Sequence, residues 1–189
     1  MSNKQEPLPF PRGESHPYAP FLSLLGREYE IEDDTYGTGR MVRLRLVRNT
    51  AASVALPARL QIMSTTANLY GIATTGMAHT TAQECYPADE KLPSAGAAVD
   101  DAYYVVVGGP ALIAQGVTTG APTLLTVGAK LVSQTAATSG ATTAGRVELQ
   151  DLTGATAVLG GQIQALVGRA LSAKTTSEGG NVLVNVGKW

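Results

Sequence analysis

DAYYVVVGGPALIA, residues 101–114, begins the part of the chain with the clearest strand pattern. Its β-branched and aromatic residues are typical of a β-strand, and the run Gly108-Gly109-Pro110 is expected to break the strand, which resumes at 111–114. This is also the longest apolar stretch of the chain. It is interrupted and too short to span a bilayer, so no membrane contact is expected.

Five further short strands are predicted after this stretch, separated by turns rich in Gly, Thr, Ser and Ala. They span residues 124–127, 130–133, 146–150, 165–171 and 181–186. Short strands at a spacing of about ten residues are typical of a sandwich or a barrel. The predicted fold class is therefore mainly β.

Upstream, charge alternation across residues 27–48 predicts a β-hairpin. Acidic residues alternate with apolar residues in its first half, and arginines do so in its second half, which is the period of a strand. With a turn around Tyr36-Gly37, one register satisfies both faces. The predicted pairs are Glu28 with Arg45, Tyr29 with Leu44, Glu30 with Arg43, and Ile31 with Val42. Exposed ion pairs contribute only about 0.2–1 kcal/mol each, so they select the register more than they stabilise it.

The region between these two patterns is less regular. Leu60 and Ile62 alternate with polar residues and predict a strand that is entered through Pro57. Residues 86–101 hold two prolines and four acidic residues with little periodicity. They predict a loop with at most one helical turn.

The first 26 residues are rich in both proline and apolar side chains. Five of the ten prolines lie within residues 1–20, and each favours extended backbone. An extended arm cannot bury apolar side chains on itself, so we expect it to dock on a neighbouring subunit. A disordered tail is the alternative. The residues predicted to bind a partner are Leu8, Phe10, Tyr18, Phe21 and Leu22, with Arg43 and Arg45 as secondary contacts.

These patterns divide the chain into an extended Pro-rich arm, residues 1–26, and a β-rich domain, residues 27–189. Within the domain, residues 27–101 form a hairpin and loop-rich part, and residues 102–189 form a compact β-module. The full prediction is an antiparallel β-barrel or sandwich with an extended N-terminal arm.

Composition excludes several classes of function. Charged residues make up 15% of the chain, against about 25% in typical domains, and the net charge is −1. A nucleic-acid binder needs a basic surface, so no nucleic-acid partner is expected. The first ten residues contain no apolar signal region, and Cys85 is the only cysteine. We therefore expect synthesis in a reducing cytoplasm.

Catalytic and metal-binding patterns are weak. Cys85 and His79 could pair as nucleophile and base, but the pattern supplies neither an orienting group nor an oxyanion site, and a buried structural cysteine is favoured. Five carboxylates could attract a hard cation, but their spacing does not match a calcium-binding loop, and a solvated loop is favoured. These carboxylates are Glu84, Asp89, Glu90, Asp100 and Asp101. No enzymatic activity, cofactor or metal is expected.

Several segments read together resemble a known family. They are residues 100–110, where a strand ends in Gly-Gly-Pro; 127–131, Val-Gly-Ala-Lys-Leu; 167–172, Val-Gly-Arg-Ala-Leu-Ser; and the terminal strand 181–186. This pattern resembles the capsid decoration (cement) proteins of tailed bacteriophages, which are small β-rich proteins on the outside of the head. The resemblance covers residues 100–189, and the arm and the hairpin are not part of it.

The resemblance implies a structural virion protein on the outer capsid surface that clamps adjacent capsomers and stabilises the head. It implies the major capsid protein as partner and a homotrimer as the assembled form. A charge-poor β surface also packs readily against copies of itself. Two alternatives stay open: a head-fibre or tail-associated β structural protein and, more remotely, a small cysteine hydrolase that uses Cys85 and His79.

Overall fold

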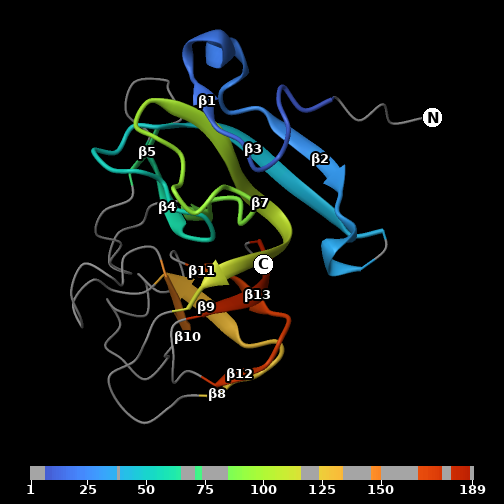
Figure 1. Cartoon of the computed structure of the whole chain (residues 1–189). Coiled ribbons are helices and arrows are strands. Elements are labelled where there is room, and N and C mark those ends of the chain that lie inside the picture. Colours follow the sequence, from blue (N-terminus) through green and yellow to red (C-terminus); the bar gives the residue numbers. More distant parts are fainter. Residues whose placement is uncertain are drawn as a thin grey trace.

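β7 (Asp101–Ala114) is a continuous strand shared by the two parts of the sheet (Figure 1). The computed structural model describes residues 7–37, 39–64, 71–73, 85–115, 124–133, 146–149, 166–175 and 180–187. The other strands in these ranges are β1 (His16–Pro17), β2 (Glu28–Glu32), β3 (Met41–Asn49), β4 (Leu60–Ser64), β5 (Gly71–Ala73), β6 (Cys85–Pro87), β8 (Leu124–Leu125), β9 (Lys130–Ser133), β10 (Val147–Leu149), β11 (Leu166–Ala170), β12 (Lys174–Thr175) and β13 (Asn181–Val186).

Eleven of the described strands form one sheet in the order β10-β9-β11-β13-β7-β3-β5-β4-β6, with β1 paired to β7 and β2 paired to β3. β8 and β12 pair with each other. Paired strands run antiparallel except β3 and β5, which run parallel. The protein is therefore mainly β, and its described helices are two short 3₁₀ segments, η1 (Ala19–Leu24) and η2 (Asp34–Tyr36). Neither described helix has the length and apolar character that a membrane crossing requires.

Both ends of this sheet bend back toward β7. Ala88, directly after β6, forms an isolated bridge with Val105 of β7, and Gln115, directly after β7, forms one with Val147 of β10. Single bridges are not continuous ladders. The described pairings therefore produce two curved halves that meet at β7, and they do not extend to a closed barrel.

β7 changes its partner halfway along its length. Residues 102–108 pair with β3 and residues 109–114 pair with β13, so the predicted break in the strand is a change of partner. Gly109 has a φ of +88°, a conformation that favours glycine. A Cβ at Gly109 would lie 2.3 Å from the backbone oxygen of Met41, so the absence of a side chain lets β3 approach β7. The expected boundary between residues 101 and 102 falls at the start of this shared strand.

The predicted hairpin is confirmed, with β2 and β3 paired in the expected register. The pairs are Glu28 with Arg45, Tyr29 with Leu44, Glu30 with Arg43, and Ile31 with Val42. η2 and Gly37 form the turn, and an Asp33 carboxylate oxygen accepts a hydrogen bond from the Thr35 backbone N–H at 2.9 Å. The apolar face of β3 is buried. A shift of the β2–β3 register by one residue is excluded, because it would turn these buried side chains toward solvent.

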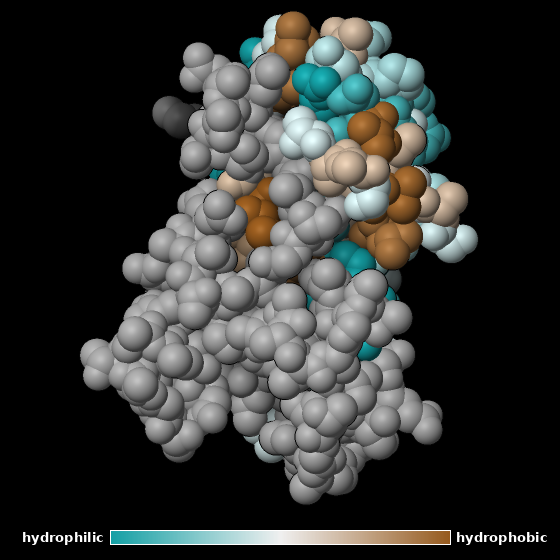
Figure 2. Space-filling view, turned by 90° about the vertical axis from the view of Figure 1, so that its left-hand side faces the viewer, coloured by the Kyte–Doolittle hydropathy of each residue, from teal (hydrophilic) through white to brown (hydrophobic). Residues whose placement is uncertain are grey.

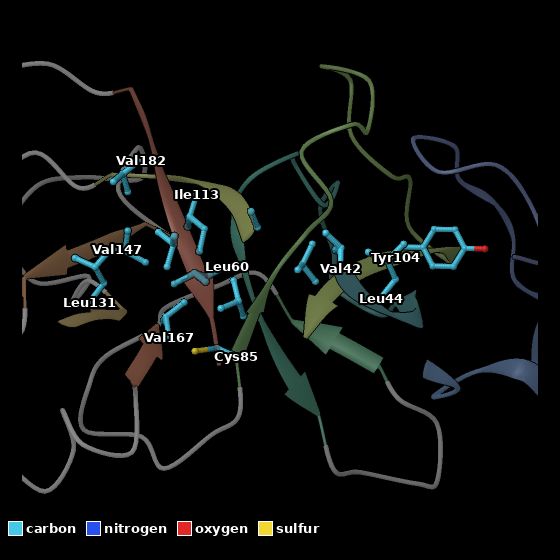
Figure 3. Packing of buried hydrophobic residues seen from close by; sticks show 14 of the residues in the cluster. Val42, Leu44, Leu60, Cys85, Tyr104, Ile113, Leu131, Val147, Val167 and Val182 are labelled. Carbon is cyan, nitrogen blue, oxygen red and sulfur yellow. The ribbon is translucent and has the colours of Figure 1, made fainter. Parts of the chain in front are cut away.

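The first half of β7 is buried on both faces. Tyr104 and Val106 belong to a large hydrophobic cluster that includes residues of β3 and of the C-terminal strands (Figure 3). Tyr103 and Val105 point the opposite way and belong to a second cluster, which includes Ala88. An unbroken apolar run, rather than alternation, is what a strand without a solvent face requires.

β8, β9, β10, β11 and β13 fall at the predicted positions, and β9 and β13 match their bounds, whereas β12 (Lys174–Thr175) lies where a turn was predicted. Side chains of β13 alternate, with Val182, Val184 and Val186 buried and the residues between them less so. Gly168 of β11 lies against β13, where a Cβ would be 2.2 Å from the Asn185 backbone oxygen. The predicted strand through Leu60 and Ile62 is β4.

The described N-terminal segment, residues 7–26, lies against the sheet and does not project from it (Figure 1). β1 pairs with the first residues of β7, and Phe10 is only 6% exposed in the larger cluster. The prediction of an arm that needs a neighbouring subunit to bury its apolar side chains is therefore wrong for Phe10. Phe10 does need a surface, but Tyr104 of the same chain supplies it.

Two glycine substitutions test whether Gly109 is needed where β7 changes its pairing partner from β3 to β13. We expect Gly109→Ala to lower the free energy of unfolding by roughly 3 kcal/mol, because it adds a backbone clash to an unfavourable φ. Gly39→Ala is the matched control, since Gly39 also has positive φ but open space around its Cβ position. It is expected to cost only about 1–2 kcal/mol. Urea unfolding of both variants measures the difference, and equal losses would contradict a steric role for Gly109.

Candidate functional site

The predicted partner-binding residues divide into buried and exposed groups. Phe10 is buried, and three others are half-buried against the larger hydrophobic cluster. These three are Leu8, Tyr18 and Phe21. Leu22 is different, because its side chain is 51% exposed. The structure thus brings four of these five residues together as internal packing and leaves one on the surface.

An aromatic cluster anchors the segment to β7. The ring of Phe10 lies 4.8 Å from the ring of Tyr104, 5.0 Å from that of Phe21 and 4.7 Å from that of His16, measured between centroids. The Tyr104 hydroxyl donates a hydrogen bond to the Phe10 backbone oxygen at 3.1 Å. Burial raises the pKa of Tyr104 to about 12, so this donor stays protonated at neutral pH.

Tyr18, directly before η1, provides a second anchor for the segment. Its ring lies 3.7 Å from the Arg48 guanidinium carbon, a cation–π contact, and its backbone N–H donates to the Asp100 backbone oxygen at 3.1 Å. Arg48 also donates to the Asp100 carboxylate, at 3.0 and 2.6 Å. Because Tyr18 precedes η1 and Phe21 lies within it, the helix is held in place and presents Leu22 outward.

Arg12 lies among three carboxylates, and none of these four side chains is more than 9% exposed. It donates through Nε to Asp89 at 2.6 Å, through Nη2 to Glu90 at 3.2 Å, and through Nη1 to Asp33. The Tyr36 hydroxyl also donates to Glu90, at 2.5 Å. These bonds fasten the N-terminal segment to the hairpin turn and to the loop after β6.

The environments of the carboxylates differ. Burial alone would raise the pKa of Asp33, but hydrogen bonds from Thr35 and the charge of Arg12 outweigh it and hold that pKa well below its usual range. Burial raises the pKa of Glu90, and the hydrogen bond from Tyr36 offsets only part of the rise. Asp33 therefore stays ionised to low pH, whereas Glu90 is protonated more readily than an exposed glutamate.

Arg43 and Arg45 lie on the polar face of β3, next to Glu28. Arg45 donates to Glu28 at 3.1 and 2.5 Å, and its guanidinium carbon lies 5.2 Å from the centre of the Tyr86 ring. Arg43 lies 3.8 Å from the other Glu28 oxygen, and its side chain is 55% exposed, against 17% for Arg45. Arg43 is therefore the more accessible of the two predicted secondary contacts.

The acidic residues considered as metal ligands have other partners. Asp89 and Glu90 bind Arg12, Asp100 binds Arg48, and Asp101 accepts a hydrogen bond from the Ser15 hydroxyl at 2.8 Å. Glu84 lies outside the described residues. Within the described ranges, no group of three or more His, Cys, Asp or Glu side chains is arranged to hold a metal ion.

Cys85 is buried and lines a cavity of about 340 Å³ at the junction of the two halves of β7. Arg43, Gly108 and Gly109 line the same cavity. His79, the base in the hydrolase hypothesis, lies outside the described residues. The pairing of Cys85 with His79 therefore stays a hypothesis.

Arg12 was not among the residues predicted to bind or to anchor the segment. The available signal was a single arginine between Pro11 and Gly13 in a Pro-rich stretch. Its partners are 21, 77 and 78 residues away along the chain. Such distant pairings have no local periodicity and cannot be identified from the pattern of one sequence.

Comparison with known proteins adds no family to this description. No protein-family model matches the chain, and no curated protein matches it. The resemblance to decoration proteins therefore stays a prediction.

Removal of the Arg12 charge tests the anchor. We expect Arg12→Leu to lower the free energy of unfolding by about 3–5 kcal/mol, because three buried carboxylates lose their shared cation. Arg40→Leu is the control at an exposed arginine, with an expected change within about 0.5 kcal/mol. Guanidinium unfolding measures both variants. A loss below about 1 kcal/mol for Arg12→Leu would show that the network does not hold the segment.

The low pKa of Asp33 predicts a specific acid response. Its folded-state pKa lies below the unfolded value of 3.8, so below about pH 4 the unfolded chain binds the extra proton and is favoured. We therefore expect Asp33→Asn to be less stable at neutral pH but to lose less stability between about pH 4 and pH 2 than the parent protein. Asp34→Asn, at the exposed neighbouring position, is the control for the removal of one carboxylate charge. Thermal unfolding across this pH range measures the slopes.

Proposed function

We propose that this protein is a structural virion protein that binds the outer surface of a phage head and bridges adjacent capsomers. In this proposal the major capsid protein is its partner, the β-rich domain associates as a homotrimer, and no nucleic acid, membrane or cofactor takes part. The observation that carries the proposal is an exposed leucine, Leu22, on a short helix that is held by Tyr18 before it and by Phe21 within it.

Anchoring favours binding because it reduces the entropy lost on association. A free arm would have to order its backbone and several side chains when it docks, at about 0.5–1.5 kcal/mol for each side chain. In this chain, Phe21 is already packed against Phe10, and Tyr18 is already packed against Arg48. A partner that receives Leu22 therefore meets a preformed surface.

The surface around η1 is mixed in character. Leu22 is 51% exposed, and Val99, which precedes the Asp100 that binds Tyr18, is 46% exposed. In the upper part of Figure 2, apolar and hydrophilic residues are interspersed over the described part of the face.

An isolated apolar contact of this size is weak. Three copies in one trimer gain by effective concentration, so modest contacts can add to firm attachment.

The proposed contacts differ from those expected of a free arm. Leu22 is the direct apolar contact, and Arg43 is the exposed secondary contact. Phe10, Tyr18 and Phe21 hold η1 in place through contacts inside the same chain. Deletion of residues 1–26 would remove Phe10 and Arg12 from the folded structure, so it would disturb folding as well as binding.

A point substitution separates the two effects. We expect Leu22→Ser to bind purified heads of the phage that encodes the chain about threefold to tenfold more weakly at each site, from the loss of about 0.7–1.5 kcal/mol of apolar burial, because Leu22 is already about half buried. Val127→Ser is the matched control, since Val127 is 66% exposed in another part of the chain. Co-sedimentation at increasing protein concentration measures binding, and light scattering confirms that both variants keep the parental mass.

Each outcome is informative. Saturable pelleting of the parent protein and Val127→Ser, with weaker pelleting of Leu22→Ser, supports attachment through η1. Equal pelleting of all three proteins would show that the contact with the head does not involve Leu22 of η1. If the parent protein does not pellet with the heads, the decoration function is wrong and the head-fibre or tail-associated alternative takes its place.

A further inference from the structure

A cavity of about 240 Å³ lies at the end of β7 and is lined by two arginines, Arg59 and Arg146. Ser94 and Gln115 supply its other polar side chains, together with Asn181. No carboxylate is among the described residues that line it. The described lining is therefore positively charged, in a chain whose overall net charge is −1.

Backbone hydrogen bonds fix the walls of this cavity. The Ala114 N–H donates to the Ala58 oxygen at 2.8 Å, and the Gln115 N–H donates to the Gly180 oxygen at 2.9 Å. Figure 3 shows Ile113, Val147 and Val182 gathered at one end of the hydrophobic cluster. These three are the sequence neighbours of lining residues, so the cavity rests on packed core.

Polar atoms around the cavity lack hydrogen-bond partners. Three of these atoms are buried and have no hydrogen-bond partner: Arg59 Nη1, Arg146 Nε and Gln115 Oε1. Gln115 as a whole is only 3% exposed. Arg146 Nη1 donates a hydrogen bond to the Gln115 backbone oxygen at 3.3 Å. Burial lowers the pKa of Arg59, and the neighbouring charge of Arg146 lowers it further. Buried donors without acceptors are unfavourable unless a ligand satisfies them.

We propose that this cavity binds a phosphate ion, with Arg59 and Arg146 as the charged donors. Arginine is suited to this role, because its planar guanidinium presents several N–H donors to an oxyanion. The volume is below that of pockets for drug-sized ligands, which indicates a small ion. Gln115 Oε1 adds an acceptor, and at neutral pH every phosphate ion keeps at least one proton to donate, whereas sulfate keeps none.

Calorimetric titration of the full chain with sodium phosphate tests this site, with sodium sulfate as the second probe. We expect saturable phosphate binding by the parent protein, at least tenfold weaker binding by Arg59→Gln, and weaker binding of sulfate than of phosphate. Arg59→Gln is preferred over a change at Arg146, because it leaves the Arg146 bond to Gln115 intact. Arg40→Gln, which removes an exposed arginine outside the cavity, should bind phosphate as the parent does.

Thermal unfolding keeps the test valid if Arg59→Gln alters folding. Phosphate should raise the melting temperature of the parent protein and of Arg40→Gln but not that of Arg59→Gln. Without phosphate, Arg59→Gln should be no less stable than the parent, because it removes a like-charge repulsion. Absence of saturable phosphate binding by the parent protein, or equal binding by Arg59→Gln, would overturn the proposal. Equal affinity for sulfate and phosphate would overturn the role of Gln115. This test does not depend on the proposed capsid function.

Discussion

Burial of β7 on both faces is the constraint on which the rest of this structure depends. A strand without a solvent face has to be covered twice. Residues 7–26 cover the side of Tyr104, and residues 88–97 cover the side of Tyr103. Both covering segments are largely irregular and form few backbone ladders. Side-chain contacts therefore have to hold these segments against β7.

The Arg12 network meets this need, because its carboxylates come from different parts of the fold. Asp89 and Glu90 belong to one covering segment, Arg12 belongs to the other, and Asp33 lies beside the hairpin turn. Buried ion pairs add little net stability, since desolvation offsets most of the attraction. Their effect is to define position: an arginine with three bonds in fixed directions allows one placement of the N-terminal segment, and hence of Leu22.

The two ends of β7 hold the two candidate surfaces. At its first residues, β1 pairs with the strand and the Ser15 hydroxyl binds Asp101, which places η1 and Leu22. At its last residues, Ala114 and Gln115 form part of the arginine-lined cavity. Gly109 lies between them and lets the strand pass from one half of the sheet to the other. A single rigid element thus connects a proposed protein contact with a proposed phosphate site.

The sequence by itself determined the mainly β class, the register of the β2–β3 hairpin and the positions of five of the six described C-terminal strands, β12 being the exception. Each of these follows from side-chain alternation and turn residues, which act over a few neighbouring positions. Tertiary structure alone decided that Phe10 packs on Tyr104, that Arg12 meets Asp89, and that Arg59 and Arg146 share a cavity. Those contacts join residues many positions apart, so no local pattern predicts them. Whether the proline-rich N-terminal segment lies on its own sheet or on another subunit depends on which surface the folded domain leaves uncovered.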